Sequence, residues 1–421
     1  MDLLKNWAYK NLKGDPIIWL VIIILSLFSI VVVYSATGTL AYKMKGGDTE
    51  FYLVKHSILV AISLLATWIF HLIDYRYYAK VSRVLLWVSV PLLIVTWQFG
   101  VNINEASRWL TIPVLNLGFQ PSDLAKLALL ITLASMLGKR QNNIHNFQKA
   151  IIPMLIWIGL VCGLIAMTNI STGILLFVTC MLLLFLGRVS MKYIGLLMII
   201  GVISGVSALI FGQRYDTVRA RFEVYVQGET SYQAKHSNIA IASGGIFGKG
   251  PGKSEQRNYL PHPYSDFVYS IIVEEYGFIG GFAVLVLYMV LLYRTTMVVY
   301  KSDKPFGGLL SIGLCFALVI QGVVNMGVTV GLGPITGLPL PLISMGGTSQ
   351  LFMGIALGMI LSVSRRKDEV NYENLERQES DEHGEMDDEL DSHGDDNADD
   401  DMDDDDDPDH ESGDDDLTDA A

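Results

Sequence analysis

Asp266 is the residue of this sequence whose type and position are best suited to acid–base chemistry. It ends a polar stretch, YLPHPYSD, and an apolar run begins directly after it. A carboxylate in this setting can accept a proton as a general base or bind a cation. Asp is also a common N-cap residue of helices. The residue by itself therefore leaves two roles open, a general base and a helix cap.

A glycine-rich stretch, IASGGIFGKGPGKS, lies upstream of Asp266 over residues 241–254. Glycines such as Gly245 and Gly248 let the backbone approach a ligand closely and leave N–H groups free for an anion. The spacing does not match GxxxxGK[ST] and no strand–helix context surrounds it, so a nucleotide-binding P-loop is not supported.

Arg108 and Trp109 form a second cluster. A guanidinium beside an indole suits a phosphate group at a membrane interface, since Arg offers a planar fork of donors. Interfacial anchoring is an equal alternative, because Trp and Arg are common at the level of the lipid headgroups. Farther along, Asp123 and Lys126 are three residues apart on an expected helix and can pair with each other.

Two further features follow Asp266. Glu274 and Glu275 are consecutive acids inside an apolar run, and at most one of them is expected to face a cavity, because neighbouring residues do not share a helix face. After Asn325, residues 331–349 read GLGPITGLPLPLISMGGTS, which is too rich in Pro and Gly for a continuous helix. Irregular backbone at membrane depth is tolerated only where it is buried in protein or lines a wet cavity. The sequence predicts a re-entrant or broken segment here, with a plain loop as the alternative.

The elements that must position these residues are long apolar runs. Hydrophobic residues make up 51% of the 421 residues, and the mean hydropathy is +0.40. Runs of about twenty apolar residues match the roughly 30 Å hydrocarbon core of a bilayer. The sequence therefore predicts an all-α integral membrane protein of about ten transmembrane helices. The expected helices span residues 16–36, 52–73, 83–100, 122–138, 149–168, 171–187, 191–212, 267–293, 307–327 and 348–364.

Charge is divided unevenly along the chain. Residues 368–421 contain 28 acids and one base, Arg377, whereas the rest carries 29 Lys and Arg against 15 Asp and Glu. The tail cannot bury enough apolar surface to offset its chain entropy, so it is expected to be disordered. It could bind a basic partner or Ca²⁺ weakly, or have no specific role. Nucleic-acid binding is not suggested. Three cysteines, Cys162, Cys180 and Cys315, lie inside apolar runs, which argues against disulfides or a metal cluster.

Lys and Arg gather in every second loop, a pattern that predicts both termini in the cytoplasm. The first apolar run lacks a small-residue cleavage site and is expected to be a retained helix. Segments 101–121 and 213–266 are then expected on the outer face, and the longer one is predicted to be ordered and functional. The expected organisation is a cytoplasmic N-terminus (1–15), a ten-helix membrane domain (16–365) with a large periplasmic loop (213–266), and a disordered acidic cytoplasmic tail (366–421).

Four stretches, in order, resemble the SEDS family (shape, elongation, division and sporulation), which includes FtsW, RodA and SpoVE, and FtsW-type members most of all. They are SRWL with QPSDLAKL, IASGGIFGKGPGKS, LPHPYSDF with VEEYGFIGG, and GPITGLPLPLISMGGTS. The resemblance covers about residues 16–365. It is therefore carried by nearly the whole chain except the tail.

The chain departs from the family pattern at several positions. His262, Tyr264 and Ser265 stand where an LPEAHTDF-like stretch has Glu and His-Thr, and Asp123 stands where Glu is usual. Residues 167–172 lack the carboxylate of a Gln-Pro-Asp-Leu-Gly-Thr pattern, and residues 344–348 read SMGGT in place of Ser-Tyr-Gly-Gly-Ser. The aspartate at position 266 is unchanged.

The resemblance implies a peptidoglycan glycosyltransferase that polymerises lipid II at the outer face of the cytoplasmic membrane, in cell division, and releases undecaprenyl diphosphate. The family's essential loop aspartate falls on Asp266, as general base, and its Arg-Trp motif on Arg108 and Trp109. A class B penicillin-binding protein and other divisome proteins are the implied partners, and a divalent cation (Mg or Mn) at Asp266 is a candidate cofactor. Further substrate contacts are expected at Lys126, Arg214, Arg219, Arg221, Gly245, Gly248, Lys253, Ser254, Glu275, Ser344, Gly346 and Gly347.

Two other functions stay open. A lipid II flippase would need a polar cavity that opens alternately to both sides, and acidic residues deep in helices would favour it. A non-catalytic scaffold for the penicillin-binding protein would need only surface contacts, and it would leave a carboxylate among Gly and Arg in an outer loop unexplained.

Overall fold

The computed structural model describes residues 12–38, 40, 49–99, 101–103, 106–112, 117–141, 144, 147–211, 231–302 and 304–365. Within these residues, eight helices are long and apolar enough to cross a membrane, and two shorter apolar helices accompany them. The predicted all-α membrane fold is therefore confirmed. The elements are α2 (Pro16–Ala36), α4 (Thr49–Leu72), α5 (Tyr75–Phe99), β1 (Val101–Ile103), β2 (Ala106–Ile112), β3 (Leu117–Phe119), α6 (Pro121–Lys139), a π-helical turn (Phe147–Ile151), α7 (Ile152–Thr168), α8 (Ile170–Leu186), α9 (Met191–Phe211), α11 (Tyr232–Gly244), a 3₁₀ turn (Gln256–Asn258), α12 (Val268–Tyr300), α13 (Pro305–Thr329) and a last helix (Gly347–Arg365).

Two helices extend farther than the apolar runs indicated. α5 begins at Tyr75, not at residue 83, and α12 continues to Tyr300, past residue 293. In the first turns of α5 the buried residues are Tyr75, Tyr78 and Ser82. Polar and charged residues lie between them, so the average hydropathy there is low although the helical periodicity is intact.

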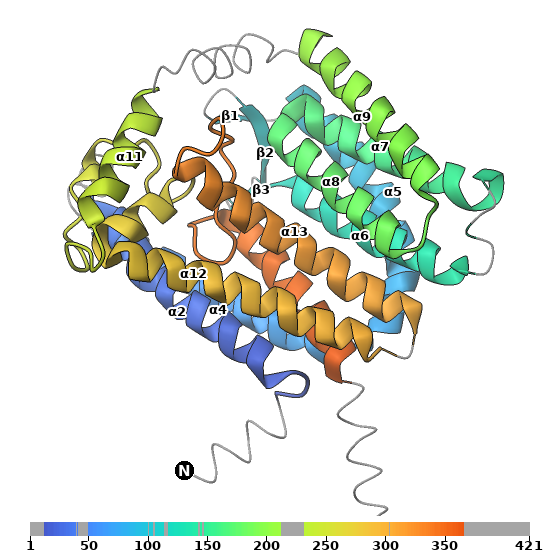
Figure 1. The fold of residues 1–421 in the computed structure, drawn as a ribbon, viewed down its shortest axis with the longest axis horizontal. Coiled ribbons are helices and arrows are strands. Elements are labelled where there is room, and N and C mark those ends of the chain that lie inside the picture. The colour runs from blue at the N-terminus through green and yellow to red at the C-terminus, as the bar shows by residue number, and fades with distance from the viewer. Residues whose placement is uncertain are drawn as a thin grey trace, which may run out of the picture. The chain divides into compact units, whose positions relative to one another are not determined.

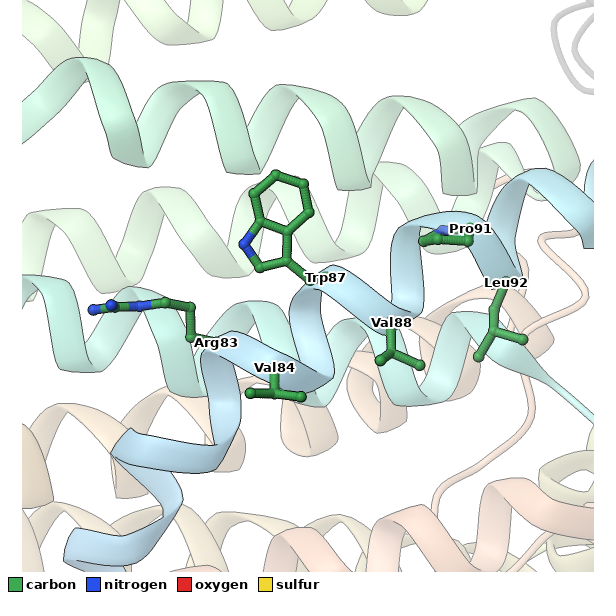
Figure 2. A pocket seen from close by; sticks show the side chains of 6 residues that line it. All are labelled: Arg83, Val84, Trp87, Val88, Pro91 and Leu92. Atoms are coloured by element: carbon green, nitrogen blue, oxygen red, sulfur yellow. The ribbon is translucent and has the colours of Figure 1, made fainter.

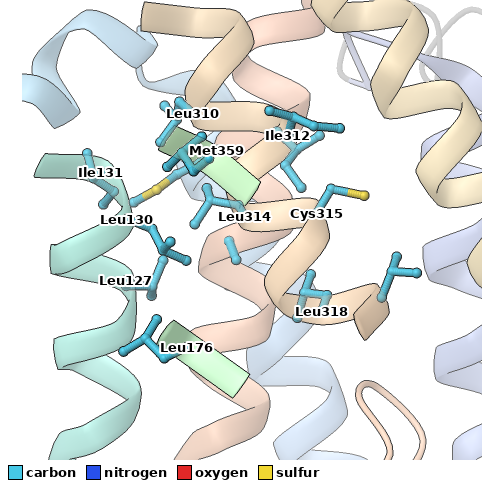
Figure 3. Close-up of a cluster of buried hydrophobic side chains, with 14 of the residues drawn as sticks. Leu127, Leu130, Ile131, Leu176, Leu310, Ile312, Leu314, Cys315, Leu318 and Met359 are labelled. Carbon is cyan, nitrogen blue, oxygen red and sulfur yellow. The ribbon is translucent and has the colours of Figure 1, made fainter. Parts of the chain in front are cut away.

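The helices form one bundle in which segments far apart in the chain lie side by side (Figure 1). α13 packs against α6, α8 and α12, and α2 packs against α4 and α12. Figure 3 shows part of the core, where apolar side chains of α6, α8, α13 and the last helix lie together. Its members include Leu127, Leu130, Leu176, Leu314, Leu318 and Met359.

One end of the bundle joins the first and last described helices. Asp15 caps α2 by accepting from the N–H groups of Ile17 (2.9 Å) and Ile18 (3.2 Å). The same carboxylate lies 2.6 Å from Arg294 Nη2 of α12, and the Asp15 N–H donates to Ser364 Oγ at 3.0 Å. The start of α2 and the end of the last helix therefore lie at the same end of the bundle.

The other end carries the strands, α11 and the segment between α13 and the last helix, and is called the strand-bearing end here (Figure 1). β1, β2 and β3 form an antiparallel sheet in that order, with Asn102 opposite Ser107 and Thr111 opposite Gly118. The predicted loop 101–121 is thus largely a small sheet between α5 and α6. The strands are short, and the sequence of this stretch indicated only the cluster of Arg108 and Trp109.

Candidate functional site

The segment between α13 and the last helix lies at the centre of the strand-bearing end. Residues 331–346 have no helix, in agreement with the predicted broken segment. Leu338, Leu340 and Ile343 are buried, which distinguishes this segment from a plain surface loop. Its carbonyl groups find partners inside the bundle: Gln321 Nε2 donates to the Pro339 carbonyl at 2.8 Å, and the Tyr288 hydroxyl donates to Pro341. Buried irregular backbone needs such partners, because no water is available there to form hydrogen bonds with its N–H and C=O groups.

This segment and α13 hold the chain just before α12 through three consecutive carbonyl groups. The Met345 N–H donates to the Tyr264 carbonyl (2.9 Å). Ser344 Oγ donates to the Ser265 carbonyl (2.6 Å). Asn325 Nδ2 donates to the Asp266 carbonyl (2.9 Å). The main chain that carries Asp266 is therefore held by residues outside its own helix.

The carboxylate of Asp266 is half-buried and close to Gly337. A Cβ atom added to Gly337 would lie 3.5 Å from Asp266 Oδ2, and the Ser265 hydroxyl donates to Oδ1 at 3.0 Å. The N-cap of α12 is Phe267, and the cap makes no side-chain hydrogen bond. The helix-cap role left open by the sequence is therefore wrong.

Tyr264 is the aromatic neighbour of this carboxylate. Its pKa is raised, first by burial and then by the nearby Tyr52 and Asp266. The Tyr264 hydroxyl is also 3.1 Å from His262 Nδ1. A phenol kept neutral in this way can donate or accept a hydrogen bond beside Asp266 without adding charge.

The other end of the same segment meets the sheet. The indole ring of Trp109 packs on Gly118 and Gly347, since Cβ atoms added to these glycines would lie 3.0 and 3.5 Å from the ring. Thr348 Oγ1 donates to the Gly118 carbonyl at 3.3 Å. Trp109 of the SRWL motif thus contacts Gly347 of the GPITGLPLPLISMGGTS motif, which also contains Ser344. The backbone of Arg108 lies in β2, and its side chain is outside the described residues.

Asp123 and Lys126 pair across one turn of α6, as the sequence predicted. Lys126 Nζ lies 2.7 Å from Asp123 Oδ1, and Ser349 Oγ of the last helix donates to Oδ2. Asp123 is buried, so the ammonium group of Lys126 is paired with a carboxylate inside the protein.

Glu274 and Glu275 are both buried, and both accept hydrogen bonds from the glycine-rich loop, defined here as residues 245–254. Glu274 accepts from Lys249 Nζ (2.9 Å) and from the Ser254 hydroxyl. Glu275 accepts from the Ser35 hydroxyl of α2 and from the Ser254 N–H (3.3 Å). Both acids therefore have partners within the fold, because the loop and α2 enclose this part of α12. The expectation that at most one of them faces a cavity stays a prediction. Lys249 has a raised pKa, chiefly through its hydrogen bond to Glu274.

The glycine-rich loop enters the hydrogen-bond ladder of α12. Gly277 has φ 69° and ψ −169°, a conformation essentially restricted to glycine, and it interrupts the helix. In a regular helix the carbonyls of Glu274 and Glu275 would accept from residues 278 and 279. Here they accept from the N–H groups of Lys249 (3.0 Å) and Gly250 (2.9 Å) instead.

The freed N–H groups beyond the interruption also bond to the loop. Phe278 N–H donates to the Gly245 carbonyl (2.9 Å), and Ile279 N–H donates to the Ile246 carbonyl (3.3 Å). The loop therefore satisfies both sides of the interruption. Gly248 serves this contact, because a Cβ there would lie 2.2 Å from the Glu275 carbonyl oxygen.

The remaining predicted contact residues are dispersed. Gly245 and Lys253 are exposed on the glycine-rich loop, and Gly346 is half-buried before the last helix. Arg214, Arg219 and Arg221 lie outside the described residues. No role for Asn325 was indicated by the sequence. The feature that could have indicated one is a polar amide side chain inside an apolar run.

Two hollows on the described surface differ in their relation to Asp266. The first, about 560 Å³, is a depression lined only by side chains of α5, including Arg83, Trp87 and Pro91, and none of the predicted site residues contributes to it (Figure 2). The second, about 320 Å³, is an apolar groove between α8, α13 and residues 334–338. Its lining includes Leu338, the neighbour in sequence of Gly337, and Gly337 is close to the Asp266 carboxylate.

The described residues contain no group of three or more His, Cys, Asp and Glu side chains that could hold a metal ion. In the described hydrogen bonds of this site, the other oxygen atoms are the Ser265 hydroxyl, bonded to Asp266, and the backbone carbonyls of Ser265 and Asp266, each of which accepts a hydrogen bond. These side chains do not amount to a resident Mg²⁺ or Mn²⁺ site, which usually joins carboxylates to substrate phosphates.

The fold and the site define a multi-pass membrane protein with a carboxylate held at one end of a helical bundle. The chain belongs to the FtsW/RodA/SpoVE family, described as cell cycle proteins, whose family model matches residues 15–369. Stage V sporulation protein E of Bacillus subtilis (strain 168) is 32% identical, over 84% of this chain and 98% of that protein. The probable peptidoglycan glycosyltransferase FtsW of Geobacter sp. (strain M18) is 32% identical, over 85% of this chain and 98% of that protein.

Solved structures share the fold. A chain of a peptidoglycan synthase complex, described as coordinating polymerization and crosslinking, has a TM-score of 0.66 at 23% identity and covers 84% of this chain and 98% of its own length. The rod shape determining protein RodA of Thermus thermophilus has a TM-score of 0.62 at 24% identity and covers 86% and 98%. At such identities the likeness shows the architecture alone.

Proposed function

We propose that this protein is a peptidoglycan glycosyltransferase that polymerises lipid II, with Asp266 as the general base. The observation that carries the proposal is the Asp266 carboxylate, half-buried, with one oxygen bonded to Ser265 and its main chain held by Asn325. The names of the relatives support the reaction class. A base must be held within hydrogen-bond reach of the proton that it removes, and a fixed main chain favours this.

The proposed reaction joins two glycans with inversion. The 4-hydroxyl oxygen of an incoming sugar attacks the anomeric carbon of a lipid-diphosphate-linked glycan, and the hydroxyl proton passes to Asp266. The bond from the anomeric carbon to the diphosphate oxygen breaks, and its electron pair leaves with undecaprenyl diphosphate. An α-linked diphosphate thus becomes a β-1,4 bond. Cationic side chains favour departure of the diphosphate. The candidates are Arg108, Lys253, Arg214, Arg219 and Arg221.

The groove between α8 and α13 supports a path for the polyprenyl chain. It is lined by apolar side chains such as Ile174, Val178 and Val324, and it reaches Leu338 beside Gly337. A lipid chain in this groove would bring its diphosphate to the end of the bundle where Asp266 lies. Such a surface suits an apolar chain, because close packing in the groove provides more favourable van der Waals contacts than disordered lipid does.

The proposed setting is the cytoplasmic membrane, with both termini in the cytoplasm and the strand-bearing end facing the periplasm. The distribution of Lys and Arg among the loops supports this orientation. The proposed organisation remains a cytoplasmic segment (1–15), a membrane domain (16–365) with its periplasmic loop (213–266), and an acidic cytoplasmic tail (366–421).

The proposed partner is a class B penicillin-binding protein, together with other divisome proteins, in cell division. A structural relative acts in a complex that coordinates polymerization with crosslinking, which supports a transpeptidase partner. The FtsW names among the relatives favour division, whereas a sporulation protein and a rod shape protein are similar as well.

The test is polymer formation by purified protein and its partner supplied with lipid II. Asp266→Asn is expected to lower the rate at least about 100-fold, because general-base catalysis typically contributes that much. Asp74→Asn is the matched control, since Asp74 is a half-exposed carboxylate in the turn between α4 and α5, paired with Arg76. Equal polymer from wild type and Asp266→Asn would refute the base assignment.

The same preparation separates the two alternative functions. Movement of lipid II between leaflets without polymer would identify a flippase. Stimulation of the transpeptidase by the wild type and by Asp266→Asn alike, with no polymer from either, would identify a scaffold.

A further inference from the structure

We propose that Asn325 is the residue that orients Asp266, a positioning role that rests on the proposed function of Asp266 as the base. Asn325 lies near the strand-bearing end of α13 and is buried. Its Nδ2 donates to two carbonyl oxygens from different parts of the chain, those of Asp266 (2.9 Å) and Leu338 (2.6 Å).

The chemistry of the two partners determines how the amide is oriented. Both partners are carbonyl oxygens, so the nitrogen must face them, because a rotated amide would set its own oxygen against two acceptors. This orientation leaves Asn325 Oδ1 buried without a hydrogen-bond partner among the described residues. An unpaired buried acceptor is costly. The two donated hydrogen bonds must therefore offset that cost.

The two hydrogen bonds of Asn325 hold the two sides of the contact between Asp266 and Gly337. One holds the peptide group of Asp266, which sets the direction of its Cα–Cβ bond. The other holds Leu338, whose neighbour Gly337 lies against Asp266 Oδ2. Asn325 thus fixes both the residue that carries the carboxylate and the segment that limits where the carboxylate can turn. Ser344 and the Met345 N–H hold only the two preceding carbonyls.

α13 offers a matched control one turn away. Gln321 is buried like Asn325, and its Nε2 donates to the carbonyl of Pro339 at 2.8 Å. It anchors the same segment as Asn325 but makes no hydrogen bond to Asp266 among the contacts of the described chain. Comparing Asn325→Leu with Gln321→Leu therefore separates the orientation of Asp266 from general anchoring of residues 337–341.

The first readout is kinetic, on full-length protein with its partner and lipid II. Asn325→Leu is expected to lower kcat by about 10- to 100-fold with KM changed by less than about twofold, because a displaced catalytic group loses rate more than binding. Gln321→Leu is expected to keep kcat within about threefold of the wild type. Thermal unfolding in detergent checks that both variants are folded. Equal kcat losses in the two variants would overturn the proposal.

The second readout does not depend on activity. An Asp266→Cys substitution is combined with each α13 variant, and the rate of maleimide labelling at position 266 is measured, with the unsubstituted chain as the blank because its three cysteines are buried. A labelling rate altered by Asn325→Leu but not by Gln321→Leu supports the proposal, and identical rates in all three backgrounds overturn it. If the wild type forms no polymer, the proposed function fails, while the labelling comparison still decides whether Asn325 orients residue 266.

Discussion

Gly248 lies against the main chain of Glu275 so closely that a Cβ atom on Gly248 would be 2.2 Å from the Glu275 carbonyl oxygen. This contact lets the glycine-rich loop supply the N–H groups that α12 lacks at its interruption. The sequence suggested that these glycines admit a ligand. In the structure they allow the backbone of the glycine-rich loop to approach the backbone of α12 closely.

Gly248→Ala is expected to destabilise the protein by about 1–3 kcal/mol, since the residue has φ 82° and the added methyl group meets backbone. Thermal unfolding in detergent measures the effect. Gly252→Ala is the control, because Gly252 has a similar φ of 76° but nothing within 4 Å of an added Cβ. Equal losses in the two variants would show that conformation alone, without the contact, accounts for the requirement.

Removing one member of the Asp123–Lys126 pair should cost more than removing both. Asp123→Ala leaves the ammonium of Lys126 without its partner in a largely buried setting, with an expected loss of about 3 kcal/mol. Asp123→Ala with Lys126→Met should recover part of that loss. A double-mutant cycle on unfolding midpoints tests this, and strict additivity of the two single substitutions would contradict it.

The Asp15–Arg294 pair should stabilise the opposite end of the bundle. Arg294→Ala is expected to destabilise by about 3 kcal/mol, because Asp15 is buried and the guanidinium contacts both of its carboxylate oxygens. Asp15→Asn should cost less than Asp15→Ala, since Asn can still cap α2. Unfolding midpoints of the three variants provide the measurement, and an unchanged midpoint for Arg294→Ala would exclude the pair as a stabilising contact.

Stability should fall at high pH through Lys249. Its folded pKa is raised above the ordinary value of 10.5 by the hydrogen bond to Glu274, with Glu255 also nearby. Such a group contributes its full stabilisation below its unfolded pKa and loses it as the pH rises through the folded pKa. Wild type and Lys249→Met should therefore differ in unfolding temperature at pH 8 and converge as the pH rises through the folded pKa of Lys249. A difference that persists unchanged at the higher pH would exclude the ammonium as its source.

Filling the apolar groove should impair substrate use more than folding. Ile174→Trp places a large side chain in the groove lining, and we expect KM for lipid II to rise about 10-fold. Leu186→Trp is the control, since Leu186 is also exposed on α8 but does not line the groove. Equal effects of the two substitutions, or none from Ile174→Trp, would argue against a lipid path there.

Much of the architecture follows from local features of the sequence. A run of about twenty apolar residues must cross a bilayer as a helix, because its own backbone is then satisfied within the segment. The density of Pro and Gly in residues 331–349 likewise argues against a continuous helix through this stretch, without reference to any neighbour. The pairing of Asp123 with Lys126 depends only on their spacing along α6.

Some local features could not be predicted from the sequence, because averaging hydropathy over a window of residues hides them. The start of α5 at Tyr75 is amphipathic, and its charged face masks its helical period. The sheet of β1, β2 and β3 is made of short strands, for which the apolar pattern is too brief to be distinctive.

Local features of the sequence specify the class of this protein, a bundle of membrane helices with polar clusters at one end, because hydrophobic length and backbone-breaking residues act over a few turns of chain. The contacts that join residues 331–349 to Trp109 and Asp266, and the hydrogen bond from Asn325 to the carbonyl of Asp266, appear only in the folded structure. Those contacts link residues far apart in the chain, and a buried hydrogen bond depends on which helices pack together, which no single stretch of sequence specifies.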